Sequence, residues 1–116
     1  MTEITEKWAR TAEPGPELDR VCAEWFSPVR GFNNYGEPIK FSTDWSAAGP
    51  LLEAMGGPAL HRHSDRHGWH IEFGFHPVGG FDLHSPTPQL AIARACAVLA
   101  ARGITRDDLE DRYADI

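Results

Sequence analysis

The chain has 116 residues, 41% of them hydrophobic and 24% charged, which suits one globular domain with a modest core. Its formal net charge of −6 argues against direct nucleic-acid binding, because phosphate backbones attract clustered Lys and Arg. No apolar run approaches the ~18 residues of a membrane span, and the first residues lack the pattern of a signal peptide. The two cysteines, Cys22 and Cys96, indicate buried thiols in a reduced setting. We therefore expect a cytoplasmic protein without membrane contact.

The N-terminal segment, residues 1–15, is polar and acidic, and we expect it to be a flexible arm. Residues 16–116 contain no repeat or linker and are predicted to form a single α+β domain. From Pro16 onward, apolar residues recur at the i, i+3, i+4, i+7 spacing of a helix. They are Leu18, Val21, Cys22 and Trp25.

A second helix is predicted within residues 41–57, "FSTDWSAAGPLLEAMGG". Ser42 or Thr43 can accept hydrogen bonds from the free N–H groups of its first turn. The Gly-Pro pair at 49–50 removes one backbone donor, so we expect it to bend or divide this helix. The expected apolar face consists of Trp45, Ala48, Leu52 and Met55.

Three strands are predicted next, at residues 59–64, 69–76 and 81–84, joined by short turns into an antiparallel meander. In the second strand, "WHIEFGFH", side chains alternate between an apolar and a polar face. The apolar face, expected in the core, consists of Trp69, Ile71, Phe73 and Phe75.

A third helix is predicted from "SPTPQLAIARACAVLAARG", with Thr87 as its cap and Pro88 in its first turn. It is apolar nearly all round, which implies cover on more than one side. We expect a second copy of the chain to cover part of it, in a symmetric homodimer. A last, charged helix is predicted after Thr105, which pairs reciprocally with Asp108.

These elements predict an α+β fold with a three-stranded antiparallel sheet between helices, an α/β/α sandwich. Strand alternation gathers polar side chains of all three strands on one face. They are His61, His63, His70, Glu72, His76, Asp82 and His84. An α/β/α sandwich covers both faces of its sheet with helices, and a strongly polar face is not expected to be buried in this way. We interpret it as a partner-binding surface.

Imidazole and carboxylate groups are also the usual ligands of Zn²⁺, which gives an alternative interpretation. On it, the chain is a metal-binding protein or a small metal-dependent hydrolase that uses the histidine face. No compact motif such as H-E-x-x-H supports this alternative. We therefore assign no metal, no cofactor and no catalytic residue. We also expect that no three histidine nitrogens converge on one point.

Four segments occur in an order that resembles the phage ABA sandwich domain family of small phage and prophage proteins. They are "ELDRVCAEWF", "FSTDWSAAGPLLEAM", "GWHIEFGF" and "SPTPQLAIARACAVLAA", within residues 17–102. The resemblance implies a sheet between helices and a phage context, and it implies no activity. The chain departs from the family pattern at residues 49–50, where the family has a continuous helix, in its histidines, and after Gly103.

The function we expect is that of a phage or prophage accessory protein that binds another protein and is not an enzyme. One concrete form is inhibition of a host defence complex such as CRISPR. The partner is a host or phage protein, and the chain itself is expected to pair as a homodimer.

Overall fold

The structure, a computed structural model, describes residues 4–26, 39–62, 68–75 and 79–109. Its helices are α1 (Glu6–Thr11), α2 (Pro16–Phe26), α3 (Trp45–Ala54) and α4 (Pro88–Ala101), and its strands are β1 (Ala59–Arg62), β2 (Trp69–Phe75) and β3 (Gly79–Ser85). A further helical turn spans residues 106–109. None of the described helices has the length and apolar character needed to cross a bilayer.

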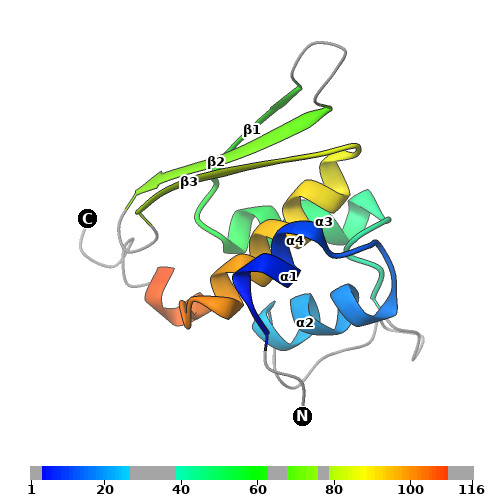
Figure 1. Ribbon diagram of the computed structural model, residues 1–116, viewed down its shortest axis with the longest axis horizontal. Coiled ribbons are helices and arrows are strands. Elements are labelled where there is room, and N and C mark those ends of the chain that lie inside the picture. Colours follow the sequence, from blue (N-terminus) through cyan, green and yellow to red (C-terminus); the bar gives the residue numbers. More distant parts are fainter. Residues whose placement is uncertain (1–3, 27–38, 63–67, 76–78, 110–116) are drawn as a thin grey trace.

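The three strands form one antiparallel sheet in the order β1-β2-β3, which confirms the predicted α+β fold (Figure 1). Ile71 lies opposite Leu83, and Phe73 lies opposite Phe81, with the two rings stacked at 4.8 Å between centroids. All four side chains are buried. Trp69, at the start of β2, is only partly buried. The side chain of Phe75, which the sequence also placed in the core, lies outside the described part.

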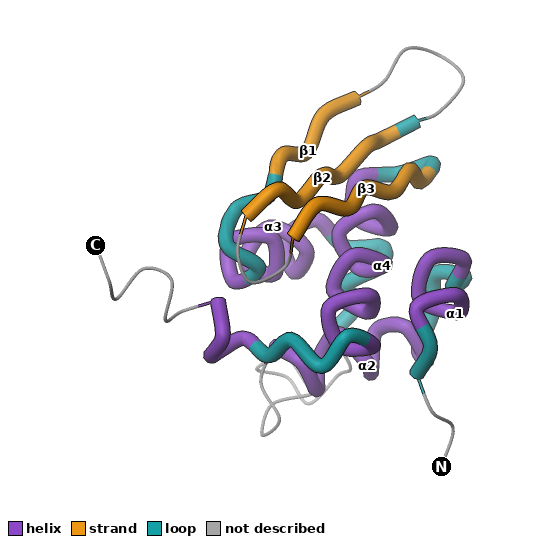
Figure 2. Tube along the Cα trace, turned by 60° about the vertical axis from the view of Figure 1, so that its left-hand side comes forward, coloured by secondary structure: helices purple, strands orange, loops and turns teal. Residues whose placement is uncertain are grey.

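Helix α4 lies at the centre of the molecule, under one face of the sheet (Figures 1 and 2). It packs against β2, β3 and the three other helices, so its neighbours within one chain bury almost all of it. Its buried side chains are Leu90, Ala91, Ile92, Ala93, Ala95, Cys96, Ala97, Val98 and Leu99. The sequence argument that this helix needs a second copy to cover it was therefore wrong. The described helices all lie on the α4 side, and the opposite face of the sheet has no helical layer among these residues.

Residues 4–15 are not the flexible arm that the sequence predicted. Thr5 caps α1, which packs against α4 and buries Ala9 completely. Ala12 is also buried, and its carbonyl accepts a 2.8 Å hydrogen bond from Nε of Arg94 in α4. The helix has only six residues, too short to be stable alone, so tertiary contacts hold it.

Helices α2 and α4 and the turn after α4 form as predicted. All four apolar positions assigned to α2 are buried. The hydroxyl of Thr87 accepts from the Leu90 N–H at the start of α4. Thr105 and Asp108 make the reciprocal pair of bonds, at 2.8 and 3.2 Å.

Helix α3 differs from its prediction in cap, face and continuity. Asp44 is the cap, and Ser42 instead donates its buried backbone N–H to Asp19. Trp45 is 51% exposed, and the helix turns Leu51 inward in its place. The helix continues through Pro50, which is exposed together with Ser46, so water can satisfy the Ser46 carbonyl that the proline leaves without a donor.

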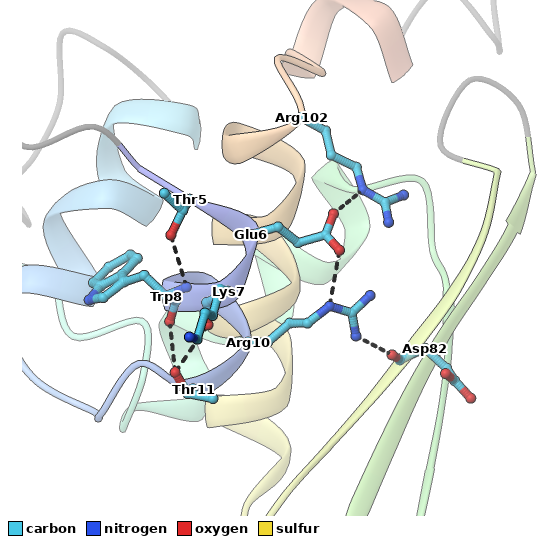
Figure 3. Close-up of polar contacts among 8 residues, drawn as sticks. All are labelled: Thr5, Glu6, Lys7, Trp8, Arg10, Thr11, Asp82 and Arg102. Carbon is cyan, nitrogen blue, oxygen red and sulfur yellow. Dashed lines mark hydrogen bonds and ion pairs between the residues drawn. The ribbon is translucent and has the colours of Figure 1, made fainter.

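The Glu6 carboxylate of α1 bridges two arginine side chains and so holds the helix in place (Figure 3). Glu6 accepts from Nε of Arg10 at 3.1 Å and from Nε of Arg102, beyond the end of α4, at 2.5 Å. Arg10 in turn donates to the backbone carbonyl of Asp82 in β3 at 2.9 Å. Both guanidinium groups also lie over the ring of Phe81. These contacts join α1, α4 and β3.

We predict that Phe73→Ala lowers the free energy of unfolding by about 3–5 kcal/mol, because it removes a buried ring from the interface of sheet and α4. Trp45→Ala, at an exposed aromatic of α3, is the matched control and should change it by about 0.5 kcal/mol or less. Urea unfolding measures both. Equal losses in the two variants would contradict the assigned core.

We predict that Glu6→Gln weakens the attachment of α1. Arg102 lowers the pKa of the Glu6 carboxyl most, burial opposes it, and Arg10 adds to the lowering. A carboxylate with a lowered folded pKa stabilises the fold above its unfolded pKa, and that contribution is lost as the pH falls through the folded value. Because the pair is largely exposed, we expect a loss of about 0.5 kcal/mol at pH 7.

Urea unfolding and amide exchange of α1 test this prediction. The difference from wild type should be full at pH 7 and should shrink below about pH 4.3, where carboxylates protonate. Glu24→Gln, which breaks an exposed pair with Arg20 inside α2 alone, is the control. Faster exchange of α1 in the control as well would contradict the bridging role of Glu6.

Candidate functional site

Strand pairing places three histidines side by side across the sheet. His61 of β1 lies opposite His70 of β2, which lies opposite His84 of β3. The neighbouring row pairs Glu72 with Asp82. Because side chains alternate along each strand, these groups all point away from α4, on the face without a helical layer.

His70 is the centre of this group and is only 6% exposed. Its Nδ1 lies 2.9 Å from Nε2 of His61, and its Nε2 lies 3.0 Å from a carboxylate oxygen of Asp82. Its ring stacks on His84 at 4.3 Å and meets the edge of His61 at 4.7 Å between centroids. Its neighbours in the sheet therefore bury His70, although it lies on the outer face.

The contact with Asp82 favours one tautomer of the neutral His70 ring. An ionised Asp82 carboxylate has no proton to donate, so with Asp82 ionised it is Nε2 of His70 that carries the proton between them. In the neutral ring Nδ1 is then the acceptor, and Nε2 of His61 donates to it. The arrangement is a chain from His61 through His70 to Asp82.

Ligand atoms of three side chains converge at this place. One nitrogen each of His61 and His70 and one carboxylate oxygen of Glu72 all lie within 4.8 Å of one another. The sequence analysis kept a zinc site of imidazole and carboxylate groups as its alternative, assigned no metal ligand, and predicted only that no three histidine nitrogens converge. The third converging group is a carboxylate, which strand alternation placed on the same face.

The other predicted site residues divide into two groups. His61, Glu72, Asp82 and His84 are exposed on the outer face, whereas His70, which the sequence assigned to the same partner-binding surface, is buried. His63 and His76 lie outside the described residues. Sequence reasoning missed Arg10, whose contact with Asp82 links the site to α1, because the segment that holds it was interpreted as an arm.

Neither of two hollows found among the described residues is lined by histidine. One, of about 600 Å³, lies beside Trp25, Phe26, Ile104 and Arg106. The other, of about 460 Å³, lies at the start of α4 beside Arg94, whose pKa is lowered by burial. The polar groups of the sheet therefore form an open surface rather than the lining of either hollow.

The two thiols lie in the core. Cys22 and Cys96 are free and fully buried between α2 and α4. Burial raises the pKa of the Cys22 thiol, and the neighbouring Cys96 raises it further. A thiol with a raised pKa in an apolar interior is unreactive.

Comparisons with protein-family models, with curated proteins and with solved structures found no match.

We predict that His70→Ala lowers the free energy of unfolding by about 1–2 kcal/mol, because it removes a buried ring that is hydrogen-bonded at both nitrogens. His84→Ala, at the exposed end of the same row, should cost about 0.5 kcal/mol or less. Chemical denaturation checks both values. A smaller loss of unfolding free energy in His70→Ala than in His84→Ala would contradict this structural role of His70.

Proposed function

We propose that this chain acts by binding another protein through the outer face of its sheet. One observation carries the proposal: the described helices all lie on one side, and the other side presents four exposed polar side chains in register. They are His61, Glu72, Asp82 and His84. A sheet face left without a helical layer is a ready surface for a partner.

The chemistry of the face supports a partner with basic and hydrogen-bonding side chains. Glu72 and Asp82 supply two carboxylates on adjacent strands, and the chain has a formal net charge of −6. The imidazoles of His61 and His84 add polar rings that can donate, accept or stack. An open face of this kind suits recognition better than hydrolysis, which needs a cavity to enclose its substrate.

We place this activity in a phage or prophage accessory protein that is not an enzyme. The resemblance of its helix and strand segments to the phage ABA sandwich family supports this setting. The continuous helix α3 agrees with the family pattern at the position where the sequence departs from it. Inhibition of a host defence complex such as CRISPR is the form of partner binding that we propose. The free, buried thiols Cys22 and Cys96 support a reducing, cytoplasmic location.

Self-association through the same outer face is an alternative to partner binding there, because a second copy would cover the residues that the partner contacts. Since α4 is covered within one chain, the sheet face replaces it as the surface for a homodimer. Light scattering at micromolar concentration tests this: a mass of twice 12.9 kDa supports a dimer, and the monomer mass contradicts it.

We predict that the double variant Glu72→Ala and His84→Ala captures the host partner about tenfold less than wild type, since it truncates two exposed contacts near the centre of the face. The control is Glu17→Ala with Glu24→Ala, on the exposed face of α2. Capture from host lysate is measured in buffer with a chelator, so that bound metal plays no part. Equal capture by both double variants would contradict the assigned face.

A further inference from the structure

We infer that His61, His70 and Glu72 form a binding site for one divalent transition-metal ion, of which Zn²⁺ best suits the ligands. This goes beyond the proposed function, because it needs no partner. Two imidazole nitrogens and a carboxylate oxygen are a known three-ligand set of zinc, with a fourth position left for water or another group. The three ligand atoms lie within 4.8 Å of one another.

The first ligand, His70, is already held in the correct tautomer. Its Nε2–H is donated to Asp82 at 3.0 Å, which leaves the Nδ1 lone pair free of a proton and directed at His61. Histidine ligands of zinc characteristically donate their other N–H to a carboxylate in this way. Burial between the rings of His61 and His84 limits rotation of the ligand.

The second ligand, His61, has its Nε2 2.9 Å from Nδ1 of His70. In a tetrahedral zinc site with bonds of about 2.0–2.1 Å, two ligating nitrogens lie about 3.3 Å apart. The exposed His61 ring reaches that separation by a small rotation. The proton between the two nitrogens then moves to Nδ1 of His61, and both rings stay neutral as the metal takes its place.

The third ligand, Glu72, has an electrostatic reason to bind a cation. It lies opposite Asp82 across β2 and β3, and carboxylates placed opposite each other destabilise a sheet. Among the described residues no Arg or Lys pairs with either carboxylate. On its other side Glu72 faces Ala59, a small residue that leaves room for an ion.

Asp82 is a positioning residue of this site. Its side chain holds His70, and its backbone carbonyl accepts from Arg10 of α1 at 2.9 Å (Figure 3). The Glu6 carboxylate in turn accepts hydrogen bonds from both Arg10 and Arg102. The strand that carries Asp82 is therefore fixed from the helical layer before any metal arrives.

Titration of the untagged, chelator-treated full chain with ZnCl₂ in a calorimeter tests the inference. We expect one Zn²⁺ per chain and no binding of Mg²⁺, which prefers six oxygen ligands. His61→Gln and Glu72→Gln, both at exposed positions, should each weaken zinc binding more than about tenfold. Asp82→Asn should weaken it about 10–100-fold. Glu24→Gln, at an exposed position of α2 away from the sheet, is the control and should leave the affinity within about twofold of wild type.

Absence of zinc binding by wild type would overturn the inference. So would equal affinity in wild type, His61→Gln and Glu72→Gln, which would assign the ion to other histidines. A loss in Glu24→Gln as large as in His61→Gln would also overturn it. Nitrogen-15 chemical shifts of the His70 ring give a separate readout for Asp82. The Nε2–H tautomer in wild type and a mixture of tautomers in Asp82→Asn support its positioning role. The same shifts in both proteins contradict it. Zinc binding is measured without a partner, and partner capture with a chelator, so either proposal can fail alone.

Discussion

The fold depends on burying α4, an apolar helix of small side chains, against five other elements at once. Four alanines at positions 91, 93, 95 and 97 are fully buried, and their size lets both the helices and the sheet approach the α4 backbone closely. Arg94 is the single charge within the helix. It is satisfied by the carbonyl of Ala12 and by the hydroxyl of Ser85, so the charge links the end of α1 to the end of β3.

The position of α4 also explains why the sheet has two chemically different faces. Strand alternation sends Ile71, Phe73 and Leu83 toward the helix, and it must send His70, Glu72 and Asp82 the opposite way. A shift of the register by one residue would place carboxylates against α4, which burial forbids. The same hydrophobic contact that stabilises the core therefore arranges the polar row on the outside.

The outer face and the helical layer are physically connected through β3. Asp82 contacts α1 through its backbone and His70 through its side chain. The ring of Phe81, next in the strand, is buried between Phe73 and the guanidinium groups of Arg10 and Arg102. Protein binding and metal binding would both use a surface that is held rigid from behind. Such support reduces the entropy lost when a ligand orders the groups that it contacts.

The sequence by itself determined the elements whose signals are local. The periodicity of residues 18–25, the caps at Thr87 and Thr105, and the alternation of β2 each depend on neighbours within a few residues, and each appears in the structure. Alternation also identified the polar face that carries the candidate site. The α+β class followed from the order of these elements.

The tertiary structure decided what depends on distant contacts. Residues 6–11 are too few to form a stable helix alone, and contacts with α4 and Asp82 hold them, so the sequence prediction treated them as an arm. Three other features also depend on the tertiary structure: α4 is covered within one chain, Trp45 is exposed, and α3 continues through Pro50. Each is decided by which segments pack against the helix and which positions stay in contact with water. Spacing placed His61, His70 and Glu72 on one face. Strand register, combined with the hydrogen bond from His70 to Asp82, was needed to bring their ligand atoms together. The distance between side chains on different strands cannot be predicted from the sequence of one strand alone.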